Sequence, residues 1–269
     1  MARVFQQACK ISPQLKHSLW KLLYQYLVKM DRDNELLFMN YGYAYLNGNK
    51  SNLVLEEADK KHQYCIQLYH HLTDSLSVSS ADMLDVGCGR GGGSSFIARY
   101  LGPRKIVGLD YSWKAVDFCA SYHSHPSLSF SHGTAESLPF GENTFGYVLN
   151  VESSRCYSSM AGFLGQVRRV LRPGGHFLFA DFRDKEQLPD LERQFASSGL
   201  KLLTWEVITE NVLRAIELDH DRKDDLVRRK APPLMTRVLA DLIGTKDSWI
   251  YRQLQSRDIE YLRCVLQKA

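Results

Sequence analysis

The chain has 269 residues, of which 44% are hydrophobic and 24% charged, and its formal net charge at pH 7 is +4. These values are ordinary for a soluble globular chain with a sizeable core, and so small a charge does not by itself indicate a nucleic-acid partner. The six cysteines form no Cys-x-x-Cys pair and no Cys/His metal spacing, which indicates free thiols in a cytoplasmic setting. No run of 18 apolar residues and no signal-peptide core is present, so the sequence predicts neither a membrane span nor a leader.

The first predicted element is a helix over Pro13 to Met30. Ser12 is a good N-cap, proline suits the first helical position, and apolar residues recur at helical spacing. The segment is also basic before its first acid, with the cations Arg3, Lys10, Lys16, Lys21 and Lys29. A peripheral contact with an anionic membrane is one interpretation. A helix packed on the domain with its lysines in water is the favoured one.

Two segments precede the first predicted strand. Aromatic residues surround a glycine in Phe38 to Tyr43, which indicates a loop that packs over another part of the molecule. Leu55 to Leu76 has the apolar spacing of a helix. The adjacent His70 and His71 cannot share one helix face, so they are not interpreted as metal ligands.

The next stretch has the pattern of a buried strand, a glycine turn and a helix. Met83 to Val86 is an apolar run, glycines follow at Gly87, Gly89 and Gly91, and Ser94 to Tyr100 is the predicted helix. Glycines allow a tight turn and a close approach of a ligand, and a helix N-terminus offers free N–H groups. The pattern predicts a nucleotide-shaped site, although the Gly-x-Gly-x-x-Gly spacing alone is a weak signal.

Two acidic residues refine that prediction. Asp110 ends the second apolar run about 20 residues after the glycines, where a carboxylate accepts from both hydroxyls of a ribose. Asp85 lies just before the glycines, where it would repel a pyrophosphate but accept a ligand with an amino group. S-adenosylmethionine carries an ammonium and a sulfonium and no phosphate, so it fits this pair better than NAD does.

Strands and helices alternate beyond Asp110. A helix is predicted over Ser112 to Tyr122 and another over Ala161 to Leu171, and further strands over Leu128–Phe130, Phe145–Leu149, His176–Ala180, Leu200–Ile208 and Glu260–Leu266. The order predicts an α/β fold: a Rossmann-like, doubly wound, seven-stranded and mostly parallel sheet, with N-terminal helices and a helical lid insertion. The expected parts are a helical cap (1–80), a cofactor-binding core (81–208), a substrate lid (209–258) and a final strand (259–269). Within the lid, the mixed charges of Asp219 to Asp225 are interpreted as a solvated helix face.

Asp85 to Gly91 resembles motif I of the class I S-adenosylmethionine-dependent methyltransferases. Gly133 to Phe140 is similar to the segment with which that family holds adenine, and Val170 to Gly175 is similar to the signature that follows its fourth strand. A narrower resemblance, to the phthiotriol/phenolphthiotriol dimycocerosate O-methyltransferases, rests on Leu149–Ser154, Gln67–His70 and Asn211–Arg214. Those enzymes methylate a hydroxyl of a long-chain polyketide lipid.

The resemblance implies a cofactor, a site and an activity. The cofactor is S-adenosyl-L-methionine, and the residues that correspond to its binding site are Asp85, Gly87, Gly89, Asp110, Tyr111, Thr134, Ala135, Asn150 and Tyr41. The implied activity is methyl transfer to a hydroxyl of a small-molecule, polyketide or lipid-like acceptor. Neither the identity of the acceptor nor the oligomeric state follows from it.

Two departures from the family's pattern bear on function. Thr134 replaces an aspartate on the adenine side, and a hydroxyl accepts a hydrogen bond more weakly than a carboxylate does. Arg155 stands where relatives have the histidine that is their usual candidate base, and arginine stays protonated at neutral pH. Glu152 and Asp181 are therefore the candidate catalytic bases, and Arg155 could hold an anionic group of the substrate or stabilise an oxyanion.

Three other functions remain as alternatives. A catalytically impaired protein that binds S-adenosylmethionine in a regulatory or scaffold role is suggested by Thr134 and Arg155. An NAD-dependent oxidoreductase is disfavoured by Asp85 and by the Leu171 to Gly175 segment. A nucleic-acid methyltransferase is disfavoured because Asn150-Val151-Glu152-Ser153 stands where base-modifying enzymes have an Asn/Asp-Pro-Pro-Tyr motif.

Overall fold

The computed structural model describes residues 34–46, 52–233 and 235–269. The helix predicted over Pro13 to Met30, with its basic residues, lies outside the described residues, so its membrane contact stays a prediction. A cytoplasmic location also stays a prediction. Within the described part of the chain, no helix is both long and apolar enough to cross a bilayer.

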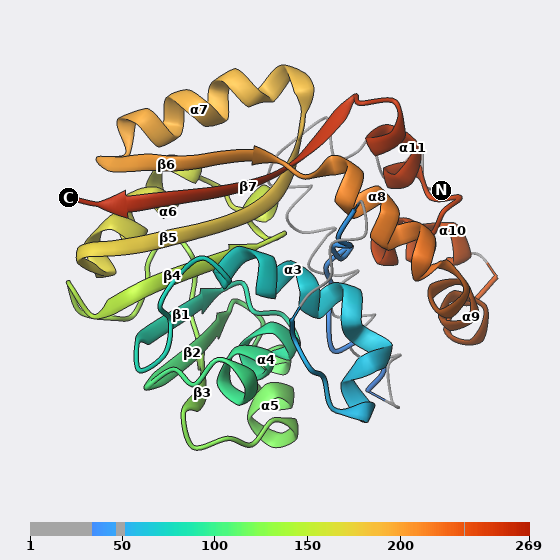
Figure 1. The fold of residues 1–269 in the computed structure, drawn as a ribbon, viewed down its shortest axis with the longest axis horizontal. Coiled ribbons are helices and arrows are strands. Elements are labelled where there is room, and N and C mark those ends of the chain that lie inside the picture. The colour runs from blue at the N-terminus through green and yellow to red at the C-terminus, as the bar shows by residue number, and fades with distance from the viewer. Residues whose placement is uncertain (1–33, 47–51, 234) are drawn as a thin grey trace.

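Seven strands form one mixed sheet in the order β3-β2-β1-β4-β5-β7-β6 (Figure 1). The strands are β1 Asp82–Val86, β2 Lys105–Asp110, β3 Leu128–His132, β4 Phe145–Val151, β5 Leu171–Asp184, β6 Leu200–Val207 and β7 Ile259–Lys268. Strands β1 to β5 pair in parallel, and β7 runs antiparallel between β5 and β6. The predicted seven-stranded, mostly parallel sheet is confirmed.

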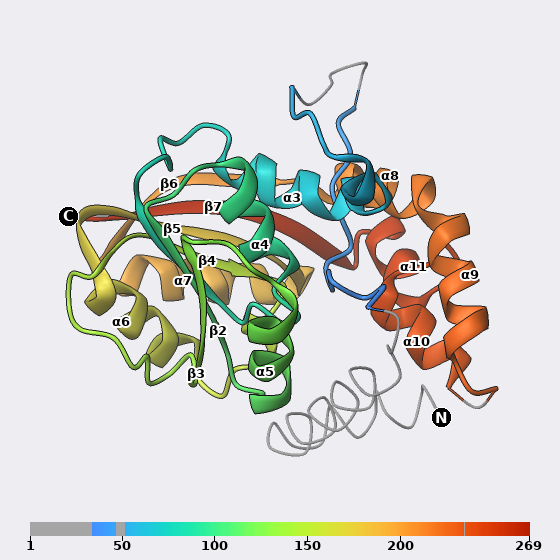
Figure 2. The ribbon, with the colours of Figure 1, turned by 90° about the horizontal axis from the view of Figure 1, so that it is seen from below.

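Helices cover both faces of the sheet, as Figures 1 and 2 show together. Their bounds are η1 Glu57–His62, α3 Gln63–Thr73, α4 Gly92–Tyr100, α5 Trp113–Tyr122, η2 Ser154–Cys156, α6 Met160–Val170, η3 Lys185–Gln187, α7 Leu188–Ser197, α8 Thr209–Leu218, α9 His220–Lys230, α10 Thr236–Ile243 and α11 Trp249–Gln255. Neighbouring strand residues face opposite ways, so Met83 belongs to the part of the core that includes residues of α3, α4, α8 and α11, whereas Leu84 belongs to the part that includes residues of α6 and α7. Both residues are fully buried, as expected for a strand covered on both faces.

Three local features differ from the sequence-based prediction. The helix expected over Leu55 to Leu76 is divided into η1 and α3. Strand β5 begins at Leu171, directly after α6, and continues through the Pro-Gly-Gly segment. Helix α7 was not predicted, although Pro189 lies in its first turn and it buries Leu191 and Phe195, which are spaced as i and i+4.

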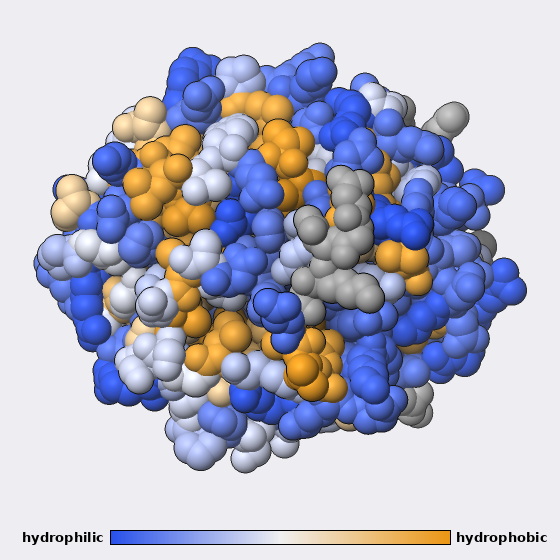
Figure 3. Space-filling model, in the orientation of Figure 1, coloured by the Kyte–Doolittle hydropathy of each residue, from blue (hydrophilic) through white to orange (hydrophobic). Residues whose placement is uncertain are grey.

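Helices α8 to α11 form the insertion between β6 and β7. They pack near the start of β7, where Ile259 pairs with Asp184 at the carboxyl end of β5. This is the end of the sheet at which open α/β folds bind ligands. The face in Figure 3 is largely hydrophilic, with several separate apolar groups and no continuous apolar surface among the coloured residues.

Candidate active site

The glycine turn after β1 is fastened to the end of β2. Gly87 and Gly89 have φ angles of +78° and +58°, which a residue with a side chain rarely adopts. The N–H of Gly87 donates to the carbonyl of Leu109 at 2.8 Å. The N–H of Gly89 donates to Asp110 Oδ2 at 2.9 Å, and Ser112 N–H donates to Asp110 Oδ1 at 2.8 Å. The structure therefore brings the predicted residues Gly87, Gly89 and Asp110 together.

Asp85 is fully buried beside this turn. Its Oδ2 accepts from the Ser94 hydroxyl at 2.7 Å, whereas Oδ1 has no partner among the described residues. Burial raises the pKa of Asp85 to about 7, and burial likewise raises the pKa of Asp110 to about 6. No described lysine or arginine forms an ion pair with either carboxylate. Sequence analysis missed Ser94, whose only signal is its position at the start of the helix after the glycines.

These two carboxylates test whether the expected cofactor fits. A buried acid with a raised pKa and a free oxygen is stabilised by a cation or by an N–H donor. The ammonium and sulfonium of S-adenosylmethionine supply positive charge, and its ribose supplies two hydroxyl donors. A pyrophosphate would add negative charge to the same place. The residues present therefore fit S-adenosylmethionine.

Asn150, at the carboxyl end of β4, closes the floor of this site. Its Nδ2 donates to the carbonyl of Val86 at 2.9 Å and lies 2.7 Å from both Ser153 Oγ and Tyr157 OH, while its Oδ1 has no partner among the described residues. A Cβ atom on Gly87 would lie 2.3 Å from Ser153 Oγ. Ser153 and Tyr157 were not predicted as site residues, because their contacts depend on the turn that follows β4.

The predicted adenine-side residues lie at the rim, next to Asp110. The N–H of Gly133 donates to the carbonyl of Asp110 at 3.1 Å, which brings the loop of Thr134 and Ala135 beside β2. Tyr111 is 41% exposed, and the neighbouring Trp113 stacks on His132 with ring centroids 3.9 Å apart. The rim thus offers exposed aromatic rings that a flat base can contact.

Glu152 is the centre of a second cluster, directly after β4. Its φ of +51° is left-handed, which is uncommon for a residue with a side chain. Oε1 accepts from the Tyr41 N–H at 2.8 Å and from the Tyr261 hydroxyl at 2.7 Å. Burial raises the pKa of Glu152 to about 7. The Tyr41 hydroxyl donates to the carbonyl of Asp241 on α10, so Tyr41 joins Glu152 to the helical insertion.

Replacing Glu152 by alanine is expected to lower the free energy of unfolding by about 2 to 3 kcal/mol. The substitution leaves two buried donors, Tyr41 N–H and Tyr261 O–H, without an acceptor. Glutamine keeps an oxygen at this position and cannot ionise, so Glu152→Gln is expected to be at least as stable as the wild type at neutral pH. Urea unfolding of both variants measures the difference, and equal losses for alanine and glutamine would contradict the assigned hydrogen bonds.

Asp181, the other predicted base, is held by two arginines. Its Oδ1 accepts from Arg155 Nε at 3.0 Å, and its Oδ2 lies 3.2 Å from Arg183 Nη1 and accepts from the Ser154 hydroxyl at 2.6 Å. Burial acts to raise the pKa of Asp181, but the charges of Arg183 and Arg155 outweigh it and leave that pKa below its ordinary value. A carboxylate in this setting takes up a proton poorly.

The charged stretch Asp219 to Asp225 is only partly the solvated face that was predicted. Asp221 and Asp225 are exposed, but Asp219 and Lys223 are buried. Lys223 Nζ donates to the carbonyl of Tyr41 at 3.1 Å and lies 3.7 Å from Asp219. The prediction was wrong for these two residues because helical spacing places them on the same face of α9 as the apolar Leu226.

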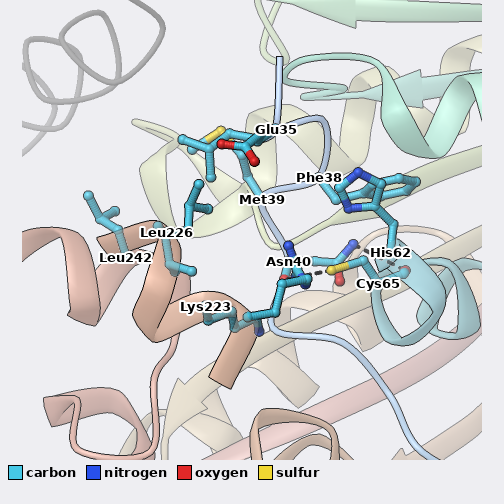
Figure 4. Close-up of a pocket in the computed structure, with 12 residues that line it drawn as sticks. Glu35, Phe38, Met39, Asn40, His62, Cys65, Lys223, Leu226 and Leu242 are labelled. Atoms are coloured by element: carbon cyan, nitrogen blue, oxygen red, sulfur yellow. Dashed lines mark hydrogen bonds between the residues drawn. The ribbon is translucent and has the colours of Figure 1, made fainter. Parts of the chain in front are cut away.

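A pocket lies beside Tyr41, between residues 35–40, α3, α9 and α10 (Figure 4). Its apolar wall includes Leu36, Met39, Leu226 and Leu242, and Lys223 lies at its polar end together with Asn40 and His62. Asn40 Oδ1 and His62 Nε2 are buried without partners among the described residues. The pocket thus combines an apolar wall with a few polar groups, and its enclosed volume of about 20 Å³ is that of about one water molecule.

Comparisons with known proteins agree with this geometry. Residues 84–179 match the family described as "Methyltransferase domain". The chain is 37% identical to a fatty-acid O-methyltransferase of Mycolicibacterium smegmatis, with 97% of this chain and 94% of the relative covered. It is 34% identical to a phthiotriol/phenolphthiotriol dimycocerosates methyltransferase of Mycobacterium leprae, with 90% and 89% covered. Among solved structures, the [4+2]-cyclase SpnF has the same fold, with a TM-score of 0.70, 20% identity and 96% of each chain covered. The strand order, the motif and these relatives show that the chain belongs to the class I S-adenosylmethionine-dependent methyltransferases.

Proposed function

We propose that this methyltransferase transfers the methyl group of S-adenosylmethionine to an oxygen of a lipid-like acceptor. The observation that carries the proposal is the adjacency of two clusters on one turn. Asn150 belongs to the cofactor cluster, and Glu152 and Arg155, which follow within five residues, belong to the second cluster. The names of the two relatives, a fatty-acid O-methyltransferase and a dimycocerosates methyltransferase, support the acceptor class.

The residues of the first cluster are proposed to hold the cofactor. Asp110 accepts from the ribose hydroxyls, Asp85 and Asn150 Oδ1 face the amino-acid part, and Tyr111, Thr134 and Ala135 flank the adenine. When bound, S-adenosylmethionine supplies an activated methyl group on a good leaving group. Positioning of the acceptor oxygen in line with that methyl group then supplies much of the rate.

The second cluster is proposed to hold the acceptor. Tyr41 connects it with the pocket between α3 and the helical insertion, because its N–H bonds Glu152 and its carbonyl bonds Lys223. The apolar wall of that pocket supports an acceptor with a hydrocarbon part. Helices α8 to α11, which supply part of the wall, remain proposed as the substrate lid.

Incubation of the protein with S-adenosylmethionine and a panel of acceptors tests the proposal. The panel contains decanoic acid, decan-1-ol, decylamine and glucose, and methyl decanoate serves as a control that has no free oxygen to methylate. Formation of S-adenosylhomocysteine and the mass of the product are measured. We expect O-methylated product from decanoic acid or decan-1-ol, and no product from decylamine or glucose. Turnover with decylamine or glucose alone, or cofactor binding without any turnover, would contradict the proposal.

A further inference from the structure

Arg155 is held in a fixed orientation in η2. Its Nε donates to Asp181 Oδ1 at 3.0 Å, and its guanidinium carbon lies 3.7 Å from the centre of the Phe182 ring. The carboxylate fixes one edge of the guanidinium and the ring covers one face. No described residue accepts a hydrogen bond from Nη1 or Nη2, and the side chain is 22% exposed. The remaining edge is therefore a fork of two donors available to a ligand.

Two arginines beside this fork share one carboxylate. Asp181 is the carboxylate of both the Arg155 and the Arg183 ion pairs, whereas Glu152 acts on Arg155 through its charge and not through an ion pair. Ser154 O–H and Phe182 N–H also donate to Asp181, which uses its remaining acceptor capacity. A partly buried cation that lacks a full counter-charge is stabilised when an anion reaches it.

The neighbouring groups do not supply that anion by direct pairing. Glu152 bonds Tyr41 and Tyr261 through Oε1 and makes no ion pair with a described cation. Asp241 accepts from Trp249 N–H, and Glu260 pairs with Arg257. Glu260 also accepts from the Thr209 hydroxyl. The fork of Arg155 thus has no carboxylate of the described chain against it.

We propose that Arg155 binds the acceptor as a carboxylate, so that the oxygen that is methylated is already an anion. The inference deepens the proposed function and rests on it. Two parallel N–H donors match the two oxygens of a carboxylate. One of those oxygens forms a bond to the methyl carbon, the carbon–sulfur bond breaks, and its electron pair goes to sulfur. A carboxylate and a sulfonium become a neutral methyl ester and S-adenosylhomocysteine, and no proton is released.

A hydroxyl acceptor would need a base, which a carboxylate acceptor does not. A hydroxyl must lose a proton during transfer, which needs a base of suitable pKa within reach. Arg155 stays protonated, and Asp181 has its oxygens occupied by two arginines and a hydroxyl, so Glu152 is the carboxylate of this cluster that would have to take the proton of an alcohol. A carboxylic acid is ionised at neutral pH without help from the protein.

Decanoate and decan-1-ol, which share one chain length, test the assignment on the wild-type protein. We expect kcat/KM for decanoate to exceed that for decan-1-ol by at least about 100-fold, as two charge-assisted hydrogen bonds allow. Methylation of an alcohol releases one proton per turnover, whereas methylation of a carboxylate releases none. A pH indicator in weak buffer, read alongside S-adenosylhomocysteine, is expected to show turnover without proton release.

Variants of Arg155 then test whether this residue binds the carboxylate of the acceptor. Arg155→Met keeps the length of the side chain and its contact with Phe182 but lacks the donors, and it is expected to lose about 100-fold in kcat/KM for decanoate. Arg155→Lys keeps the charge without the fork and is expected to lose about 10-fold. Arg168→Met, at an exposed position on α6, is the matched control. Binding of S-adenosylhomocysteine to each variant reports that the cofactor site is intact.

The outcomes separate the two proposals. Methylation of decan-1-ol in preference to decanoate, with one proton released per turnover, would overturn the carboxylate assignment and leave the proposed function standing. Retention of decanoate turnover by Arg155→Met would overturn the role of Arg155. Failure to methylate either decyl compound, with cofactor binding intact, would overturn the proposed function and this inference together.

Discussion

Replacing Asp110 by alanine is expected to weaken the binding of S-adenosylmethionine by at least about 100-fold. Two ribose hydroxyls that donate to one carboxylate contribute about 1.5 to 3 kcal/mol each, and each 1.4 kcal/mol is about tenfold in affinity. Asp110 also accepts from the N–H groups of Gly89 and Ser112, so its loss loosens the glycine turn as well. Isothermal titration with S-adenosylmethionine and with S-adenosylhomocysteine measures the change.

Two controls separate the ribose contact from a general loss of structure. Asp117→Ala removes an exposed carboxylate from the neighbouring helix α5 and is expected to bind the cofactor as the wild type does. An analogue of S-adenosylhomocysteine without the two ribose hydroxyls is expected to bind the wild type weakly and the Asp110→Ala variant no more weakly. A large further loss in that variant would show that Asp110 acts mainly through the turn. Binding by the variant as tight as that of the wild type would remove Asp110 from the cofactor site.

Replacing Asp85 by asparagine is expected to stabilise the free protein at neutral pH while it weakens cofactor binding. Burial raises the pKa of Asp85 from an ordinary value of 3.8 to about 7. Between these values the unfolded chain has released a proton that the folded protein keeps, so stability falls as the pH rises from about 4 to about 7. The full difference corresponds to about 4 kcal/mol above about pH 7. Asparagine cannot ionise and avoids that loss.

Thermal unfolding across this pH range, without cofactor, measures the effect. The melting temperature of Asp85→Asn minus that of the wild type is expected to grow as the pH rises from about 4 to about 8. Asp82, in the same strand, is the matched control. Its substitution by asparagine is expected to change the stability at neutral pH in the opposite direction. Burial acts to raise its pKa, but ion pairs with Arg104 and Arg172 lower it, so it contributes stability that is present above about pH 4 and lost below. Asp82→Asn is therefore expected to be less stable than the wild type at neutral pH, and a pH-independent difference for Asp85→Asn would contradict its assignment.

The Asp85→Asn substitution is expected to weaken cofactor binding, although it stabilises the free protein. A cationic ligand favours the ionised form of Asp85, so the affinity of the wild type for S-adenosylmethionine is expected to fall as the pH falls below about 7. Asp85→Asn is expected to bind about 10-fold or more weakly at about pH 8 and to lose this part of the pH dependence. Titration of both proteins at about pH 6 and pH 8 measures it. Equal affinities at about pH 8 would show that Asp85 does not contact the cofactor.

The sequence by itself determined the sheet and the glycine turn. Strand, turn and helix are short-range patterns, since alternating apolar runs, glycines and caps act over a few residues. Asp85 and Asp110 could be named because each lies within or directly after an apolar run. The family resemblance rests on the same short segments, and the relatives bear it out. Helix α7 was missed although its first-turn proline and its buried Leu191 and Phe195 are local signals of the same kind.

Only the tertiary structure decided the partners of the buried charges. Glu152 is bonded by Tyr41 and Tyr261, which are 111 and 109 residues away in the chain. Asp181 became a paired carboxylate because η2 brings Arg155 beside β5, and Lys223 became buried because α9 packs its face against Tyr41. Whether an ionisable group is solvated, paired or isolated depends on what folds over it. Burial and charge neighbours set its pKa, and neither is a property of sequence spacing.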